Sequence, residues 1–189
     1  MARPFLADRK GPDKPRSRTR ETLETFAVAI GLALLIRTTV AEARWIPSDS
    51  MLPTLEQGDR LIVEKISYRF ESPQRGDIVV FDPPQGSGFG GGNAFIKRII
   101  GLPGETISVS NGKVFIDGKA LEPDWKLEAP DYEMPERSIP ARHVFVMGDN
   151  RNNSADSHVW GALPMDNIIG RATLRFWPPH RVGSPDPPR

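Results

Sequence analysis

An uninterrupted apolar run close to the amino terminus is the feature that most constrains what this chain can fold into. Residues 26–36, Phe-Ala-Val-Ala-Ile-Gly-Leu-Ala-Leu-Leu-Ile, contain no polar side chain. A helix over residues 22–40 extends about 28 Å at ~1.5 Å per residue, which just suffices to cross a bilayer. Glu24 and Arg37 would lie near its ends, where charged side chains reach the interface. The run therefore predicts a membrane-spanning helix.

The charge that precedes this run predicts its orientation. Residues 1–20 contain seven basic and two acidic side chains, so by the positive-inside rule this segment stays in the cytoplasm. A core helix of a soluble domain fits poorly, because the run is apolar on every face. A cleaved secretory signal ending at Ala41-Glu42-Ala43 fits as well as an anchor does. Both the anchor and the signal carry residues 45–177 across a membrane.

These features divide the chain into four parts. We expect a basic cytoplasmic tail over residues 1–21, a transmembrane anchor helix over 22–44, an extracytoplasmic β-rich domain over 45–177 and a Pro-rich disordered tail over 178–189. The protein would be single-pass in the cytoplasmic (inner) membrane. Its N-terminus would lie inside and its domain on the periplasmic or extracytoplasmic face.

Short apolar runs after residue 60 predict strands rather than long helices. β-Branched and aromatic residues dominate these runs, and none sustains a helical period. Asn111-Gly112 and Asp117-Gly118 separate neighbouring runs and are typical of tight hairpin turns. The fold class is therefore mainly β, an antiparallel sheet or barrel-like domain behind a single N-terminal transmembrane helix. The runs are residues 61–63, 78–81, 95–100, 107–109, 114–116, 144–147 and 168–177.

Several kinds of site are excluded. The chain has no cysteine, which rules out a disulfide scaffold, a thiol nucleophile and thiolate metal ligands. Residues 86–91 match G-x-G-x-x-G, but they follow prolines and precede a strand-like run, so we interpret them as a loop. Residues 149–156 lack the central glycine of a calcium loop, and the three histidines have no metal-binding spacing. We therefore expect no cofactor and no metal.

Three polar segments remain as candidates for chemistry. Ser48 and Ser50 lie in Ile-Pro-Ser-Asp-Ser-Met-Leu-Pro-Thr-Leu, for which an ordinary Ser/Pro turn is the simplest interpretation. Lys97 shares one face of a predicted strand with apolar neighbours such as Phe95, where a lysine commonly snorkels. Residues 148–158 form a polar segment that also suits a turn. None of the three segments is specific alone.

Together the three segments are specific. Ser-Met-x-Pro-Thr-Leu, Lys-Arg-Ile-Ile-Gly-Leu-Pro-Gly-Glu and Gly-Asp-Asn-Arg-x-Asn-Ser-x-Asp-Ser occur in this order behind a hydrophobic anchor. From about residue 26 to Trp177 the chain resembles the bacterial type I signal peptidases. The resemblance implies a membrane-bound serine endopeptidase with a Ser–Lys dyad, which removes N-terminal signal peptides from exported precursors after small-x-small sites. Its partners would be those precursors and membrane lipid, with no nucleic acid, and the insertion at about residues 119–141 would be reduced.

The resemblance also implies a role for each matching residue. Ser50 would be the nucleophile, Lys97 its general base, and Ser48 a hydrogen-bond donor to the oxyanion. The supporting residues would be Ser154, which hydrogen-bonds the lysine amine, Asp149 with its ion-pair partner Arg98, and Asp156. The residues implied to line the pockets for small substrate side chains are Ile46, Met51, Leu55, Phe95 and Ile96.

The dyad requires a lysine that loses its proton near neutral pH. At an ordinary pKa of about 10.4, a lysine is neutral in roughly one molecule per thousand at pH 7.5. Burial against Phe95 and Ile99 would lower the pKa of Lys97, provided that no carboxylate pairs directly with its amine. A fall of about 2.5 units would cost about 3.4 kcal/mol, which the rest of the fold must offset.

The resemblance suggests how a substrate would be held. An extended peptide would pair with the strand edges at residues 46–48 and 93–95, with alternate side chains entering two shallow pockets. Trp45 and Met51 would lie in the membrane interface.

Three residues depart from the usual family pattern. His158 stands where the family usually has arginine, so a neutral histidine would hydrogen-bond Asp156 in place of a fixed ion pair. Asn152 replaces a usual aspartate, and Phe95 replaces a frequent tyrosine. Neither of these last two changes touches the dyad.

Three other classes of protein are considered. A Ser–His–Asp hydrolase would use Ser50 with His143 or His158, and replacing both histidines would distinguish it from a Ser–Lys enzyme. A catalytically inactive, membrane-tethered β-domain would bind exported chains without cutting them. A self-cleaving Ser–Lys repressor would need a helical DNA-binding domain, for which the apolar run at residues 26–36 leaves no room.

Overall fold

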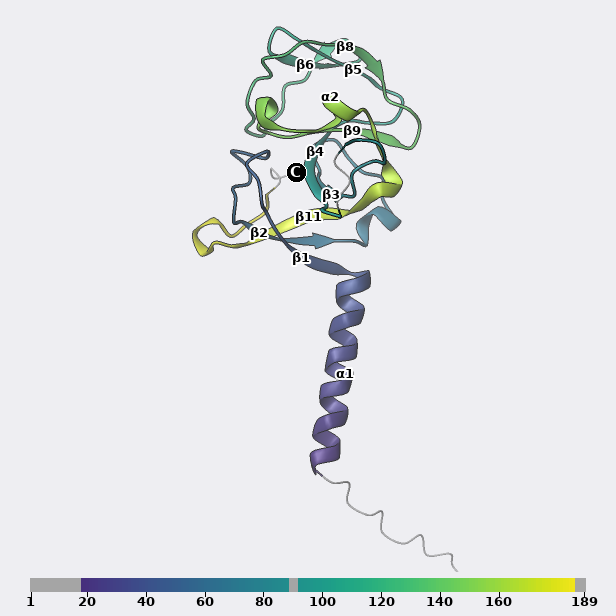
Figure 1. Ribbon diagram of the computed structural model, residues 1–189, viewed down its shortest axis with the longest axis vertical. Helices are drawn as coiled ribbons and strands as arrows, with labels where there is room; N and C mark the ends of the chain where they lie inside the picture. The colour runs from purple at the N-terminus through teal and green to yellow at the C-terminus, as the bar shows by residue number, and fades with distance from the viewer. Residues whose placement is uncertain (1–17, 89–91, 186–189) are drawn as a thin grey trace, which may run out of the picture.

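A computed structural model of the protein describes residues 18–88 and 92–185. Helix α1, Arg18–Thr39, extends below a β-rich domain (Figure 1). Strand β1, Ala41–Trp45, begins after the single residue Val40. The helix predicted over residues 22–44 is therefore wrong at both ends, because it begins earlier and gives way to a strand at Ala41. Residues 1–17 of the predicted cytoplasmic tail lie outside the described residues.

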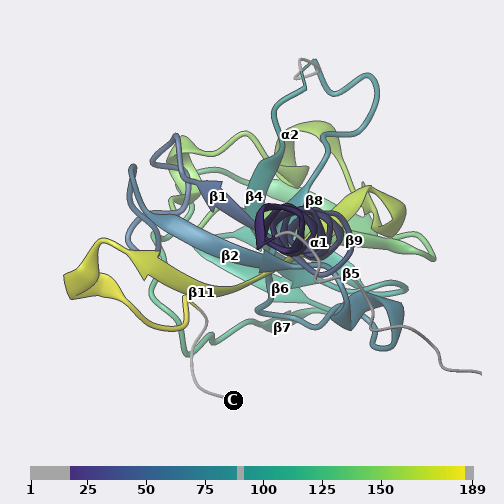
Figure 2. The same ribbon diagram turned by 90° about the horizontal axis from the view of Figure 1, so that it is seen from below.

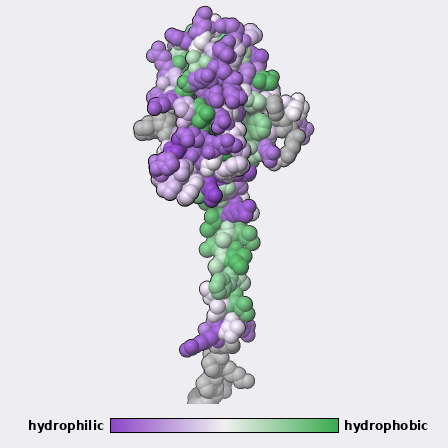
Figure 3. Space-filling model, turned by 60° about the vertical axis from the view of Figure 1, so that its left-hand side comes forward, coloured by the Kyte–Doolittle hydropathy of each residue, from purple (hydrophilic) through white to green (hydrophobic). Residues whose placement is uncertain are grey.

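Helix α1 presents apolar side chains on all sides and buries none of its residues. Figure 3 shows it as a hydrophobic column beneath a largely hydrophilic domain surface. Its 22 residues extend about 33 Å at ~1.5 Å per residue. By length and composition the helix is able to cross a membrane. Apolar side chains on every face of a helix are stable in the hydrocarbon of a bilayer.

The junction between α1 and the domain is short and hydrogen-bonded on both sides. The Val40 N–H donates to the Ile36 carbonyl at 2.8 Å, and the Lys65 N–H donates to the Val40 carbonyl at 2.8 Å. Lys65 directly follows strand β2, Arg60–Glu64, which pairs with β1 along its whole length. The helix is therefore attached to two neighbouring strands rather than to one.

A seven-stranded sheet forms the body of the domain, in the order β1-β2-β11-β3-β4-β9-β10. Its pairings are all antiparallel within the described residues. The remaining strands of this sheet are β3 Ile78–Phe81, β4 Phe95–Gly101, β9 His143–Met147, β10 Leu163–Pro164 and β11 Ile168–Trp177. Short helices connect them: η1 Ser67–Arg69, η2 Arg151–Asn153, α2 Ser157–Trp160 and η3 Met165–Asn167.

A second, four-stranded sheet has the order β7-β6-β5-β8. Its strands are β5 Thr106–Ser110, β6 Lys113–Ile116, β7 Lys119–Ala120 and β8 Met134–Ser138. Asn111 and Gly112 have φ values of 50° and 73°, and Asp117 and Gly118 have 48° and 72°. Two successive positive φ values are what a two-residue hairpin turn requires, so both predicted hairpins are confirmed. The mainly β, antiparallel fold class is confirmed, with all seven predicted runs forming strands.

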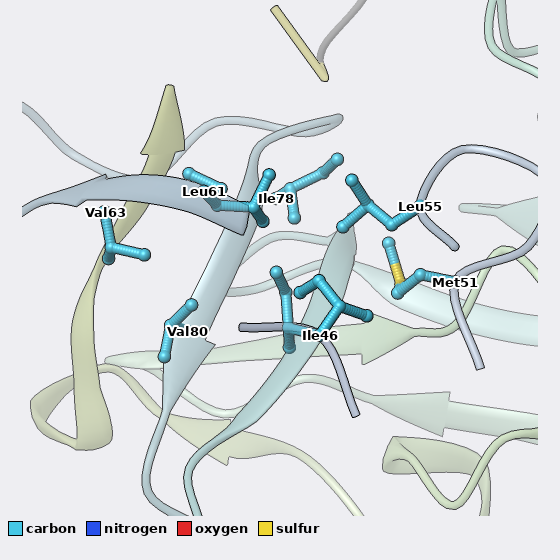
Figure 4. Packing of buried hydrophobic residues seen from close by; sticks show 9 residues of the cluster. Ile46, Met51, Leu55, Leu61, Val63, Ile78 and Val80 are labelled. Atoms are coloured by element: carbon cyan, nitrogen blue, oxygen red, sulfur yellow. The ribbon is translucent and has the colours of Figure 1, made fainter. Parts of the chain in front are cut away.

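Three clusters of buried apolar side chains hold these layers together. One joins β2, β3, β11 and the start of β4 to the loop after β1 (Figure 4). A second lies between β4, β9 and the four-stranded sheet, and so fixes the two sheets to each other. A third covers the opposite face of β3, β4 and β9. Strand β4 is therefore packed on both faces, which makes it a rigid support for its side chains.

The chain folds back against the domain after β11. A short helix, η4 Pro179–Arg181, follows the strand, and Gly183 and Arg175 exchange backbone hydrogen bonds of 2.8 and 3.0 Å. The disorder predicted for residues 178–189 is therefore wrong for residues 178–185. The physical reason is that Arg181 of this turn, together with Arg175 of β11, finds acceptors on another part of the chain, as described below. Residues 186–189 lie outside the described residues.

Candidate active site

Ser50 lies in the loop between β1 and β2, residues 46–59, which we call the Ser50 loop. Its two ends are joined, because the Ile46 N–H donates to the Asp59 carbonyl at 2.9 Å and the Gly58 N–H donates to the Ile46 carbonyl at 2.9 Å. Apolar side chains from within the loop enter the core cluster of Figure 4. The loop is therefore anchored at its base and along its inner face.

Lys97 lies on β4 and meets Ser50 across the loop. Its Nζ is 2.5 Å from Ser50 Oγ, and the two residues are 4% and 8% exposed. A neutral amine accepts the serine proton in this arrangement, which is the geometry of a hydroxyl nucleophile beside its base.

Burial sets the protonation of this lysine. It lowers the pKa of Lys97 from 10.5 to about 8, while the carboxylates of Asp156 and Asp149 act in the opposite direction. The Nζ also lies 5.8 Å from the centroid of the Phe95 ring. With a pKa of about 8, roughly a quarter of the molecules carry a neutral amine at pH 7.5, against about one in a thousand for a free lysine.

Asp149 does not bind the lysine because it is committed to Arg98. Its carboxylate accepts hydrogen bonds of 2.9, 3.2 and 2.8 Å from the Arg98 guanidinium, and both side chains are fully buried. The guanidinium also donates to the Gly76 carbonyl at 2.8 Å and lies 4.9 Å from the Trp125 ring centroid. The pair implied by the resemblance is present, and it balances a buried charge that would otherwise favour the ammonium form of Lys97.

Asp156 organises the segment that follows β9. Its Oδ2 accepts the Gly148 N–H at 2.8 Å, and its Oδ1 accepts the His158 N–H at 3.1 Å and lies 2.7 Å from His158 Nδ1. The histidine ring is stacked on Tyr132, with centroids 4.4 Å apart. His158 thus binds the Asp156 carboxylate through both its backbone N–H and its ring.

Ser154 does not make the hydrogen bond to Lys97 that the resemblance implies. Its Oγ is buried and has no hydrogen-bond partner among the described residues. It packs instead on Gly148, where an added Cβ would lie 2.3 Å from Ser154 Oγ and 2.3 Å from the Ser50 carbonyl oxygen. The physical reason is this close approach, which seats Ser154 against the backbone behind the nucleophile.

Ser48 is exposed beside the dyad. Its Oγ lies 3.4 Å from Ser50 Oγ, two residues along the same loop. A hydroxyl at this distance is placed to reach an oxygen that develops on a carbonyl attacked by Ser50.

The residues implied to line substrate pockets are divided by burial. Met51 and Leu55 have no exposed surface and belong to the core under the Ser50 loop, so their contact with substrate stays a prediction. The same burial excludes Met51 from the membrane interface. Ile46 and Ile96 are also in this cluster, at 2% and 7% exposed, while Phe95 is half-buried and packs edge-on against Phe81.

Two residues near the dyad were not singled out from the sequence. Thr54 Oγ1 donates to Asp149 Oδ2 at 2.6 Å and thereby ties the Ser50 loop to the buried ion pair. Both backbone polar groups of Gly148 are hydrogen-bonded: Arg151 Nε donates to its carbonyl at 3.0 Å, and its N–H donates to Asp156. Thr54 lies within the first motif and Gly148 is the first residue of the third motif. Their position in these motifs could have identified them from the sequence.

Neither histidine offered for a Ser–His–Asp site is bonded to Ser50 within the described residues. His143 Nδ1 lies 2.9 Å from the Ala141 carbonyl, and His158 is bound to Asp156. The serine's basic partner is the lysine. A buried serine hydroxyl against a buried amine on a β-domain is the arrangement expected of a serine hydrolase that uses lysine as its base.

Comparison with known proteins agrees with this class. A family model described as signal peptidase, peptidase S26, matches residues 19–177. The chain belongs to this family. The probable signal peptidase I-1 of Synechocystis sp. is 59% identical over 167 residues, covering 87% of this chain and 85% of that protein. Signal peptidase I of Leptolyngbya laminosa is 54% identical over 178 residues, covering 93% and 88%. The probable chloroplastic thylakoidal processing peptidase 2 of Arabidopsis thaliana is 47% identical over 165 residues, covering 86% of this chain and 45% of that protein.

Proposed function

We propose that this chain cuts signal peptides from exported precursors with Ser50 as nucleophile and Lys97 as general base. The chain is a serine endopeptidase of the S26 family, with signal peptidase I activity. The observation that carries the residue assignment is the 2.5 Å contact between the buried amine and the serine hydroxyl. The following steps assign each proton and bond to a residue.

In the first step Ser50 Oγ attacks the carbonyl carbon of the scissile bond while its proton passes to neutral Lys97 Nζ. The carbonyl oxygen becomes an oxyanion, for which the Ser50 backbone N–H and the Ser48 hydroxyl are the proposed donors. The Lys97 ammonium then gives its proton to the leaving nitrogen as the C–N bond breaks. The mature amino terminus departs, and the signal peptide remains as an ester on Ser50.

In the second step water replaces the departed amine. Lys97, neutral again, takes a proton from this water as the oxygen attacks the ester carbonyl. The ester bond breaks, the proton passes from Lys97 to Ser50 Oγ, and the signal peptide leaves as a carboxylic acid that loses its remaining proton to solvent. A single amine thus serves both halves of the reaction because it takes up one proton and releases it again in each half.

The start of strand β4 supports the proposed binding of an extended substrate. Strand β9 pairs with β4 at Arg98, Ile99 and Gly101, whereas residues 95–97 have β3 as their strand partner among the described residues. Within this length of strand, the Lys97 side chain reaches Ser50 in the loop, with Nζ 2.5 Å from Ser50 Oγ. A peptide added there would place alternate side chains toward the dyad. The tightly packed floor beneath the loop favours small residues at these positions.

The protein is anchored in a membrane through its N-terminal helix, and we propose that the anchor is retained. The alternative cleavage site, Ala41-Glu42-Ala43, lies within β1, where Glu42 Oε2 binds Lys65 Nζ at 2.7 Å. Cleavage there would remove part of a paired edge strand. We place the domain on the side to which precursors are exported. Because relatives include cyanobacterial and thylakoidal peptidases, the thylakoid membrane is a candidate beside the cytoplasmic membrane.

The outer face of β1, β2 and β11 supports contact with lipid. Trp45, Arg60 and Trp177 stand in one row across these strands, and the two tryptophans are 58% and 48% exposed. Ile62 and Leu174 stand in the next row on the same face. This face lies beside the end of α1 (Figures 1 and 2). Tryptophan with arginine at such a position is typical of a membrane–water boundary.

Cleavage of a precursor with an Ala-x-Ala site tests the function. The full chain in liposomes should cut it, and Ser50→Ala and Lys97→Ala should each lose at least about a thousandfold in rate. Lys113→Ala, which removes an exposed lysine, is the matched control and should keep full activity. If Lys97→Ala cuts at the wild-type rate, the dyad assignment is wrong. If the wild-type chain binds the precursor and leaves it intact, the inactive β-domain is the better description.

A further inference from the structure

The carboxy-terminal turn brings two arginines against the Ser50 loop. Arg175 lies on β11 and Arg181 in η4, and the backbone bridge from Arg175 to Gly183 holds the turn beside the strand. Arg175 Nε also donates to the Arg181 carbonyl at 2.5 Å. In Figure 1 this turn forms the yellow end of the chain, next to β2. These contacts hold the two arginines side by side, so that both side chains extend to the Ser50 loop.

Both arginines bind the backbone of Thr54, four residues after Ser50. Arg175 Nη1 donates to the Thr54 carbonyl at 2.9 Å, and Arg181 Nη2 donates to the same oxygen at 3.3 Å. The Thr54 side chain binds Asp149 at 2.6 Å. One loop residue thus joins the carboxy-terminal turn to the buried ion pair next to the lysine.

Carboxylates of the loop complete this contact. Asp59, which is 2% exposed, lies 3.1 Å from Arg181 Nη2 and 3.6 Å from Arg175 Nη1. Arg181 Nη1 also pairs with Glu56. A buried carboxylate needs a cationic partner, and the turn supplies two. Asp59 also closes the base of the loop, because its carbonyl accepts the Ile46 N–H. The two arginines therefore stabilise the base of the loop from outside it.

We propose that Arg175 and Arg181 are positioning residues for Ser50, and that residues 178–185 belong to the working catalytic unit. The family match ends at residue 177, so this segment lies beyond it. The proposal rests on the proposed function, in which Ser50 is the reacting group. A nucleophile displaced by about 1 Å loses roughly a hundredfold in rate, so a loop held at Thr54 and Asp59 protects the 2.5 Å contact to the base.

Steady-state cleavage by the full chain tests the proposal. Arg181→Ala should lower kcat roughly tenfold with KM within about twofold, because the loop moves while the substrate edge of β4 does not. Arg181→Lys should restore the thermal midpoint but not kcat, since an ammonium keeps the charge near Asp59 and lacks the guanidinium fork that also reaches Thr54. Arg142→Ala is the matched control, because it breaks an exposed ion pair of 2.9 Å to Asp166.

The outcomes are separable from failure of the proposed function. Wild-type kcat in Arg181→Ala overturns the positioning role, as does recovery of both kcat and the thermal midpoint in Arg181→Lys. A fall in kcat that only follows the folded fraction, measured by thermal unfolding, also overturns it. If Arg181→Ala does not fold, Arg181→Lys and Arg175→Lys are compared in its place, and wild-type kcat in both refutes the proposal. The proposed function fails independently if Ser50→Ala retains cleavage.

Discussion

Replacing the buried base by an apolar side chain of similar length should inactivate the protein and stabilise it near neutral pH. Burial lowers the pKa of Lys97 from 10.5 to about 8. The unfolded chain therefore holds a proton that the folded chain releases between these values, and stability rises with pH across that window. Below pH 8 the cost is fully present and amounts to about 3 kcal/mol.

The net effect of Lys97→Met follows from two opposing quantities. Methionine removes the cost of burying the charge but also removes the hydrogen bond to Ser50, which is worth about 1 kcal/mol. We expect the variant to be more stable than wild type by about 2 kcal/mol at pH 7. At pH 9.5 the remaining burial cost is about 1 kcal/mol, so the two chains should be nearly equal in stability.

Urea unfolding of the full chain in detergent micelles measures this difference, with the fluorescence of the four tryptophans as the signal. Lys113→Met, at an exposed position, is the control and should change stability by less than about 0.5 kcal/mol at either pH. The reasoning is refuted if Lys97→Met is no more stable than wild type at pH 7. It is equally refuted if the gain is the same at pH 7 and pH 9.5, because a pH-independent gain would not come from the lysine's proton.

Three further predictions concern the surroundings of the dyad. The value of kcat/KM should rise with pH and reach half of its maximum near pH 8, because burial lowers the pKa of Lys97 to about 8. Asp156→Asn should move this midpoint to lower pH, because the Asp156 carboxylate raises the pKa of Lys97. A midpoint near pH 10 would contradict the assignment. Ser48→Ala should reduce kcat by about a hundredfold or more without changing the thermal midpoint, and a loss below about threefold would exclude Ser48 as an oxyanion donor. Gly148→Ala should abolish cleavage, because its Cβ would lie 2.3 Å from the Ser50 carbonyl oxygen. Gly31→Ala, in α1 with nothing within 4 Å of the added Cβ, is its control, and equal activities would show that the close contact is irrelevant.

The strands and hairpins were predictable because their signals are local. Alternating β-branched residues and the Asn-Gly and Asp-Gly turns act within a few residues of one another. Strand β1 was not predictable in this way, since Ala-Glu-Ala-Arg-Trp contains good helix formers and becomes a strand only by pairing with β2. The prediction of disorder for the carboxy-terminal turn failed for a related reason. Its prolines suggest disorder, whereas the hydrogen-bond acceptors that hold it in place lie far away in the sequence, in the Ser50 loop.

The dyad was predictable from three motifs taken together, whereas its packing was not. No sequence pattern separates Met51 and Leu55, which fill the core, from Ile96, which keeps some accessible surface. Spacing also does not reveal that Ser154 rests on Gly148 rather than on the lysine. Contacts such as Arg175 to Thr54 join residues 121 positions apart, and these depend on the complete fold.

The one-residue link at Val40 has a geometric consequence for the choice of scissile bond. With its N–H bound to the helix and its carbonyl bound to the residue after β2, the link leaves the domain little freedom to tilt over the lipid. The reactive oxygen is then carried at a set height above the bilayer surface. A precursor held in the same membrane would offer Ser50 only the peptide bonds at that height. The number of residues between the precursor's membrane span and the scissile bond would then be set by the distance of Ser50 from the bilayer.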